Sequence, residues 1–463
     1  MLIRNATIAT STAVFKGDVL VIESKIAAIG EGLSAAGIRA AEDDPGEIID
    51  AEGLYLLPGG VDVHTHMDLD VGFTRSSDTF LTGTIAAACG GTTTIIDHMA
   101  FGPAGASLHH QVEVYEKLAE DAVIDYGFHG VIQHVDDGVL AEMDELAKRG
   151  ITSFKIYLTY DFKLSDAAIQ RVLTKALERG YMICVHCEDD GMLTSLRQQY
   201  LLEGFATPRY HALSRPSECE LLAVQRMLAL SRRVGDAPLY VVHLSTELGL
   251  EAIRAAKARG QQRVFAETCP QYLLLDDSRY DDPSEGLKYI MSPPLRKLND
   301  EEALWCSLAA GEIDTIATDH CPFFFAAQKQ RGKDDFTLCP GGASGVEERM
   351  PLIFSHGFMK GRLTLPQLVW LCCTRPAQLF GLGDSKGDIK VGMDADLVLF
   401  DANREFSFTK EHLHENVDYT PYEGLPQQGY PILTISRGEV IVEEGSFTGN
   451  RGRGRYLNRR RIT

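Results

Sequence analysis

Four histidines and one aspartate end or follow apolar, strand-like segments, and their side chains suit a divalent metal ion. His64 and His66 end the first of these segments, and the other candidates are His186, His243 and Asp319. Because side chains along an extended chain alternate every two residues, His64 and His66 lie on the same side of the chain. Zinc and similar ions prefer imidazole and carboxylate ligands. The sequence therefore predicts a metal centre where these segments converge.

Lys155 lies within the apolar segment 153–157 (SFKIY), which predicts a buried amine. An isolated buried ammonium is costly, and it repels nearby metal cations. Ion pairing with an acid, Schiff-base chemistry, or reaction with CO₂ to form an anionic carbamate would each relieve that cost. The residues alone leave all three open. A carbamate has two oxygens, enough to bridge two metal ions.

Eight strand-like runs alternate with longer helix-like stretches in the middle of the chain. They cover residues 60–64, 93–97, 125–132, 153–157, 182–186, 240–243, 264–268 and 314–317. Alternating strands and helices are typical of a parallel sheet, and eight such units predict a closed (β/α)₈ TIM-like barrel. No Gly-x-Gly-x-x-Gly turn follows the first strand, which argues against an open dinucleotide-binding sheet. Because barrels carry their reactive groups at the carboxyl ends of the strands, the candidate ligands are expected to meet at one mouth.

Short β-rich runs separated by turn residues occur at both ends of the chain. They cover residues 2–8, 17–22, 25–29, 387–401 and 438–445. We therefore predict a second, smaller β-sandwich-like domain built from segments 1–53 and 384–450, with the barrel at 54–383.

Charge and hydropathy restrict the partners of the protein. Lys and Arg total 45 against 65 Asp and Glu, and the net charge of −20 would repel a nucleic-acid backbone. The basic tail 451–463 is therefore expected to be a solvated arm or a subunit-interface segment rather than an RNA site; its arginines are Arg451, Arg453, Arg455, Arg459, Arg460 and Arg461. The absence of a long apolar run and of a signal-peptide core predicts a cytoplasmic protein with no membrane partner. Ten cysteines in a large, mostly apolar setting predict reduced thiols.

Several ordered motifs resemble those of one enzyme family. They are 58–66 (PGGVDVHTH), 153–155 (SFK), 185–186 (VH), 242–245 (VHLS) and 317–320 (ATDH). Together they resemble the hydantoinase/dihydropyrimidinase family of cyclic amidohydrolases over nearly the whole chain. Within the family, the sequence is most similar to bacterial D-phenylhydantoinases through 88–99 (ACGGTTTIIDHM), 209–212 (RYHA) and 269–274 (CPQYLL).

The resemblance implies a centre with two divalent metal ions, expected to be zinc, and a homotetramer. It assigns the first ion to His64, His66, Lys155 and Asp319, and the second to His186, His243 and the other oxygen of a CO₂-derived carboxylated Lys155. A hydroxide bridging the ions would attack the ring carbonyl of a cyclic ureide while the second ion polarises it.

The resemblance also assigns roles to residues around the metals. Asp319 would carry the proton from the hydroxide to the leaving nitrogen, and the Tyr160 hydroxyl would stabilise the oxyanion. The main chain at Ser292 would bind the cyclic amide. The family usually has Pro-Asn-Gly at a third binding position, where residues 340–342 read PGG, so Gly341 takes the place of the asparagine.

The expected substrate is a 5-monosubstituted hydantoin with an aromatic side chain, preferably the D-enantiomer, opened to an N-carbamoyl amino acid. Leu69, Phe73 and Phe162 are candidate walls of the substituent pocket. Dihydroorotases usually carry an arginine two residues after the second histidine, where this chain has Asp68, so dihydroorotate is a poor candidate.

Four alternatives stay open. A dihydropyrimidinase acting on dihydrouracil or dihydrothymine and an allantoinase would share the metal ligands. A non-catalytic interaction homologue should lack one of the six ligand positions, all of which are filled here. A Schiff-base lyase would use Lys155 without a metal.

Overall fold

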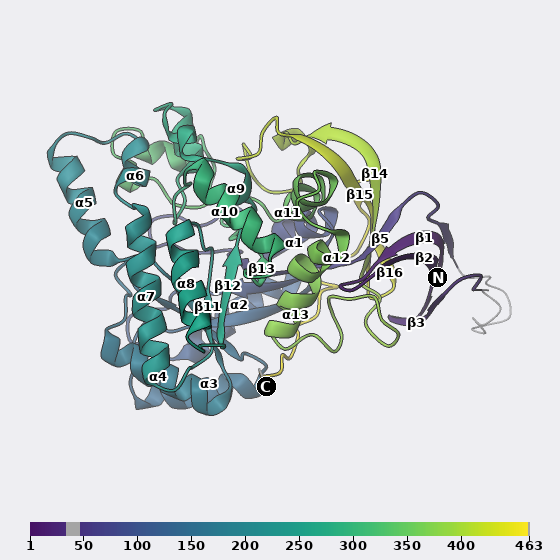
Figure 1. Ribbon diagram of the computed structural model, residues 1–463, viewed down its shortest axis with the longest axis horizontal. Helices are drawn as coiled ribbons and strands as arrows, with labels where there is room; N and C mark the ends of the chain where they lie inside the picture. The colour runs from purple at the N-terminus through teal and green to yellow at the C-terminus, as the bar shows by residue number, and fades with distance from the viewer. Residues whose placement is uncertain (34–46, 462–463) are drawn as a thin grey trace.

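The computed structural model describes residues 1–33 and 47–461. Parts of the predicted segments 1–53 and 451–463 therefore lie outside the described residues. The strands form two hydrogen-bonded sheets, one of eight strands in the middle of the chain and one of nine strands from the chain ends (Figure 1). The predicted combination of a (β/α)₈ barrel with a smaller β-domain is confirmed. No described helix is long and apolar enough to cross a membrane.

The eight-stranded sheet is parallel and follows the chain from β6 to β13. Its strands are β6 Gly60–Thr65, β7 Thr92–His98, β8 Asp125–Val131, β9 Ser153–Tyr157, β10 Met182–His186, β11 Leu239–Val241, β12 Val264–Thr268 and β13 Thr315–Ile316. The segment after β13 joins the first strand: the Asp319 N–H donates to His64 O (2.9 Å) and the His66 N–H to His320 O (2.8 Å). These bonds bring the two edges of the sheet together as a barrel.

Strand β11 ends two residues earlier than predicted, because the φ of 39° at His243 is incompatible with extended backbone.

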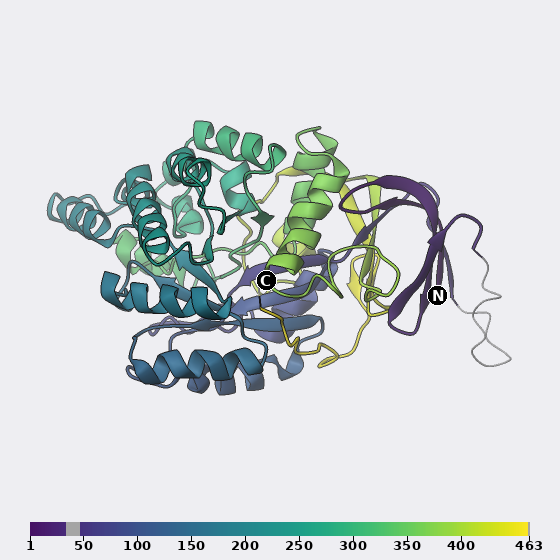
Figure 2. The same cartoon turned by 60° about the horizontal axis from the view of Figure 1, so that its bottom comes forward.

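Helices cover the outside of the barrel (Figures 1 and 2). They are α1 Phe80–Cys89, α2 Leu108–Leu118, α3 Asp137–Lys148, α4 Asp166–Arg179, α5 Asp190–Leu202, α6 Arg209–Leu213, α7 Ser217–Arg233, α8 Glu247–Ala258, α9 Pro270–Leu274, α10 Leu298–Ala309, α11 Arg349–Leu352, α12 Leu365–Val369 and α13 Arg375–Leu379, with π-helical turns at Ile353–Met359 and Trp370–Thr374.

Helix α4 illustrates how local sequence sets the ends and the buried face of these helices. The Ser165 hydroxyl accepts a hydrogen bond from the Ala168 N–H at the start of the helix. Gly180 ends the helix with a left-handed φ of 71°, a conformation in which other residues are strained. The buried residues recur at helical spacing and pack on the barrel; they are Ile169, Val172, Leu173 and Ala176.

The second sheet joins the two ends of the chain in the order β17-β16-β15-β14-β5-β1-β2-β3, with β4 paired to β1. Its strands are β1 Leu2–Ala9, β2 Val14–Ile22, β3 Lys25–Gly30, β4 Ile48–Asp50, β5 Tyr55–Pro58, β14 Leu397–Ser407, β15 Pro426–Ser436, β16 Glu439–Glu443 and β17 Ser446–Phe447. Strand β5 lies inside the segment predicted to be barrel, but it pairs antiparallel with β14, where Leu57 faces Val398. It therefore connects the two halves of this sheet.

The basic tail was predicted to be a solvated arm or a subunit-interface segment; the first of these is wrong at Arg459, which is buried, while Arg451, Arg455, Arg460 and Arg461 are exposed. The Arg459 side chain is only 2 % exposed and donates hydrogen bonds to Phe128 O in β8 and to the Ser153 hydroxyl in β9. The Tyr456 hydroxyl donates to Arg149 O (2.7 Å). Figure 2 shows the yellow chain end running from the small sheet to the barrel. The Arg459 guanidinium thus attaches the tail to two neighbouring barrel strands, β8 and β9.

Candidate metal centre

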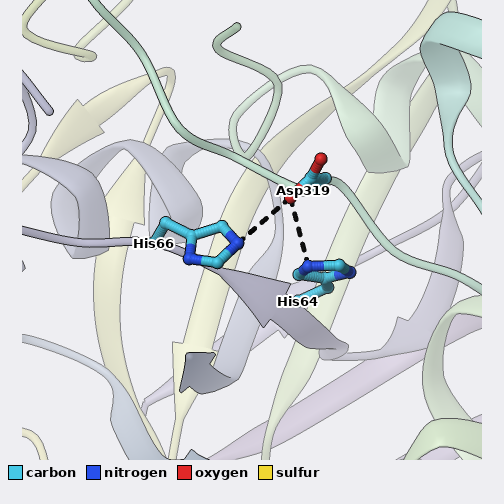
Figure 3. Close-up of side chains that lie close together, drawn as sticks. All are labelled: His64, His66 and Asp319. Atoms are coloured by element: carbon cyan, nitrogen blue, oxygen red, sulfur yellow. Dashed lines mark ion pairs between the residues drawn. The ribbon is translucent and has the colours of Figure 1, made fainter. Parts of the chain in front are cut away.

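His64, His66 and Asp319 converge at the carboxyl end of the barrel (Figure 3). The Nε2 atoms of His64 and His66 lie 3.1 and 3.2 Å from Asp319 Oδ1. His64 belongs to β6 and Asp319 follows β13, so closure of the sheet brings them together. Asp319 has a positive φ of 55°, a strained conformation for a residue other than glycine, which the barrel closure imposes.

His186 and His243 form a second pair next to the first. His186 Nδ1 lies 2.9 Å from His243 Nε2, and the rings of His64 and His243 are stacked with centroids 5.5 Å apart. The other ring nitrogen of His243, Nδ1, is buried without a hydrogen-bond partner. The structure thus brings all four predicted histidines and Asp319 to one place.

Two buried glutamates, which the sequence did not predict as site residues, lie behind these histidines. Glu267 Oε1 is 2.5 Å from His64 Nδ1, and Glu188 Oε2 is 2.9 Å from His186 Nε2. A carboxylate on one ring nitrogen holds the proton there and leaves the lone pair of the other nitrogen free for a metal. The free nitrogens, His64 Nε2 and His186 Nδ1, point into the site. This arrangement of lone pairs fits metal ions.

The protonation state of Asp319 depends on its burial and on the two histidines beside it. Burial raises the pKa of Asp319, but the charge of His64 and hydrogen bonds from His64 and His66 outweigh it and hold that pKa well below its usual range. Asp319 is therefore a carboxylate at neutral pH, as a metal ligand has to be.

Lys155 projects into the same space from β9. The side chain is buried, and its Nζ lies 3.4 Å from His64 Nε2. Burial lowers the pKa of the amine, which favours the uncharged form that reacts with CO₂. Lys155 forms no ion pair with any described carboxylate within 4.0 Å, so the ion-pairing alternative has no partner in this part of the chain.

Tyr160 lies at the barrel mouth beside His186, with ring centroids 5.3 Å apart. It is 39 % exposed and has a positive φ of 72°. Burial raises the pKa of its hydroxyl, and the positive charge of Arg215, whose guanidinium pairs with Glu188, partly offsets that rise. Tyr160 thus lies beside one of the candidate histidine ligands, with the charge of Arg215 near its hydroxyl.

Ser292 and Gly341 are neighbours although they are far apart in sequence. A Cβ atom added at Gly341 would lie 3.5 Å from the Ser292 hydroxyl. The next residue, Gly342, has a φ of 152° and packs so close to Cys321 O that an added Cβ would lie 2.3 Å from it, which requires glycine there.

The three candidate pocket residues are not in one cluster. Phe162 stacks on Phe101 with centroids 4.0 Å apart, and Phe101 in turn packs on Tyr157, whose ring is stacked with that of His186. Phe73 is 52 % exposed and lies under the guanidinium of Arg331. Leu69 is half-buried and packs on the barrel core. The sequence missed Phe101, which follows β7 and is the direct partner of Phe162.

Two segments of the chain match models described as the amidohydrolase family, residues 55–233 and 356–442. The chain is 49 % identical over 461 residues to a D-phenylhydantoinase of Escherichia coli O9:H4 (strain HS), covering 99 % of this chain and 98 % of that protein.

Solved structures agree with this relationship. A dihydropyrimidinase from Brevibacillus agri NCHU1002 is 42 % identical with a TM-score of 0.95, and a D-hydantoinase from Bacillus sp. AR9 is 41 % identical with a TM-score of 0.96. Both comparisons cover 100 % of this chain and 99 % of the other. Members of the amidohydrolase family use divalent metal, in agreement with the cluster of His64, His66 and Asp319. The chain therefore belongs to the hydantoinase/dihydropyrimidinase family and is a cyclic amidohydrolase.

Proposed function

We propose that the protein opens 5-monosubstituted hydantoins, preferring the D-enantiomer and an aromatic substituent, to give N-carbamoyl amino acids. The observation that carries this proposal is the convergence of four histidines, Lys155 and Asp319 at one barrel mouth. The relatives named D-phenylhydantoinase and D-hydantoinase favour hydantoin as the substrate class. All six ligand positions are filled, which argues against a non-catalytic homologue.

Two divalent ions, proposed to be zinc, would be held by this set of side chains. Lys155, as a carbamate, would contribute one oxygen to each ion, and the remaining ligands would be His64, His66 and Asp319 for the first ion and His186 and His243 for the second. When bound, such ions lower the pKa of water and polarise a carbonyl. Metal analysis together with ¹³C NMR of protein incubated with labelled bicarbonate would test both proposals.

The chain's own residues would then bind the ring and move the proton. The main-chain groups of Ser292 and Gly341 would hold the ring amide next to Tyr160. The Tyr160 hydroxyl would donate to the oxygen of the attacked carbonyl as negative charge develops there. Asp319 would accept a proton from the attacking water and transfer it to the ring nitrogen as the carbon–nitrogen bond of the ring breaks.

We propose Phe162 as the principal wall of the substituent pocket; Leu69 and Phe73, which lie outside its aromatic stack, stay candidate walls. Support for Phe162 is its stacking on Phe101 next to Tyr157, close to the proposed metal ligands. Burying a phenyl group there would favour aromatic hydantoins by about 1.5 to 3 kcal/mol, or roughly ten- to hundredfold.

The test is a comparison of kcat/KM on metal-replete protein for D- and L-5-phenylhydantoin, dihydrouracil, allantoin and dihydroorotate. We expect D-5-phenylhydantoin to be opened fastest. The solved dihydropyrimidinase among the relatives makes dihydrouracil the second candidate. A higher kcat/KM for dihydrouracil would assign the protein to that activity and contradict the hydantoin proposal.

We further propose a homotetramer located in the cytoplasm, as the family resemblance implies. Light scattering of the purified protein would test the number of subunits. Cell fractionation would test the location.

A further inference from the structure

Lys329 is a fully buried lysine that no proposed step uses. Its side chain has 0 % exposure, and its Nζ donates hydrogen bonds to Ile290 O (2.8 Å) and Pro340 O (3.3 Å). No carboxylate of the described residues lies within 4.0 Å of this amine. A buried ammonium without a counter-ion is costly, so its hydrogen bonds to two carbonyls have to offset that cost.

The two carbonyls belong to the segments proposed to bind the substrate ring. Ile290 comes two residues before Ser292, and Pro340 directly precedes Gly341. The Gly342 N–H also donates to Ile290 O (3.0 Å). Lys329 therefore ties together two segments that are about fifty residues apart in sequence.

The carbonyls around Ser292 are held in the same way. Tyr289 O accepts from the Tyr280 hydroxyl (2.9 Å), Met291 O from His211 Nε2 (2.7 Å), and Pro293 O from the Tyr272 hydroxyl (2.8 Å). These bonds leave little freedom for the segment 289–293.

In contrast, the main-chain N–H and C=O groups of Ser292 and Gly341 make no hydrogen bond to any described residue. Ser292 is half-buried and Gly341 is exposed, so a ligand can reach these peptide groups and displace water from them. Both donors and both acceptors are available to a cyclic amide, which carries the complementary N–H and C=O groups.

We infer that Lys329 is a positioning residue that holds the Ser292 and Gly341 peptides in register for the ring amide of the substrate. This inference rests on the proposed function and deepens it. A hydrogen bond to Pro340 O also polarises the peptide that carries the Gly341 N–H, which makes that N–H a stronger donor to the ring. Lys329 itself does not touch the substrate.

The experiment is steady-state kinetics of the metal-replete Lys329→Met variant with D-5-phenylhydantoin and with dihydrouracil. We expect KM to rise about tenfold or more for both substrates, with kcat within about threefold of wild type, because loss of ground-state ring binding raises KM alone. KM should rise by the same factor for both substrates, since Lys329 orders the ring-binding site that they share. Metal content should not fall, because Lys329 contacts none of the proposed metal ligands. The thermal midpoint can fall because Pro340 O loses its donor, so KM is measured at a temperature at which the variant is folded.

Lys386→Met is the matched control. Lys386 is also buried, but its Nζ lies 2.6 Å from both Asp125 and Asp396, between the barrel and the small sheet. This variant should lose thermal stability and keep the wild-type KM.

Wild-type KM in folded, metal-replete K329M, or a rise for only one of the two substrates, would overturn the inference while the ring-opening function stands. Failure of the wild type to open either ring would overturn the proposed function and the inference with it. If neither Lys329→Met nor Lys329→Gln folds, the amine acts in stability and the inference is wrong.

Discussion

Replacing Glu267 with glutamine tests the claim that a carboxylate behind the site sets the metal affinity of His64. Glu267 is fully buried and accepts three hydrogen bonds, from His64 Nδ1 (2.5 Å), from the His243 N–H (3.0 Å) and from the Tyr240 hydroxyl (2.8 Å). One carboxylate thus orients a proposed ligand of each metal ion. Glutamine has the same shape, so Glu267→Gln should fold and retain a carbonyl oxygen for His64 and His243.

The expected loss of metal affinity in Glu267→Gln follows from the lost negative charge. A neutral acceptor makes the imidazole less basic, and loss of such a partner lowers metal affinity by about 10- to 100-fold, or roughly 1.4 to 2.8 kcal/mol. Because Glu267 and His64 are both fully buried, solvent does not screen this interaction.

The assay is competition for zinc with a graded chelator, followed by metal analysis of the protein. Tyr240→Phe is the control, because it removes one hydrogen bond to Glu267 and keeps the charge, so its metal affinity should stay within about threefold of wild type. Equal metal affinities of E267Q and wild type, with equal thermal midpoints, would refute the reasoning.

Three further changes are expected to separate the roles of other residues. Lys155→Ala should lower the bound metal and abolish turnover, because the proposed bridging anion is lost; a variant with both metals and near-normal kcat would exclude that bridge. Asp319→Asn should keep substrate binding but lower kcat by about 10²-fold or more, since an amide cannot accept and return a proton, and an unchanged kcat at full metal occupancy would remove Asp319 from that role. Arg459→Met should lower the free energy of unfolding by about 1 to 3 kcal/mol in denaturant titration, because Phe128 O loses its buried donor, while kcat of the folded protein stays at the wild-type value; an unchanged stability would show that the tail contributes nothing to the barrel.

The barrel strands could be predicted from sequence because each is a short apolar run bounded by polar residues. The candidate histidine and aspartate ligands could be predicted because they end or follow those runs. Strand β15 could not, since its first half (PQQGY) is polar and contains proline. Such a segment is typical of a loop, and only its pairing with β14 makes it part of a strand; β16 pairs with the second half of β15.

Glu267, Lys329 and Arg459, which support the candidate site and the barrel, could not be predicted for a different reason. Glu267 lies in a strand (VFAET) in which polar side chains can face either solvent or the barrel interior, and only closure of the barrel decides which. Lys329 and Arg459 occur in polar, basic stretches that are typical of exposed chain. Their burial depends on contacts with carbonyls that are distant in sequence, and the local sequence does not indicate those contacts.

The pairing of β5 with β14 also determines when the protein can fold as it is synthesised. Leu57 pairs with Val398, so the small sheet cannot be completed until the whole barrel has been translated. At about 5 to 20 residues per second, the intervening chain takes roughly 20 to 70 s to emerge from the ribosome. During that time β1, β2 and β3 can pair with one another, but the edge of β5 stays open. Nascent chains are therefore exposed to edge-to-edge association until the last strands arrive, and a chaperone that covers this edge would raise the yield of folded protein.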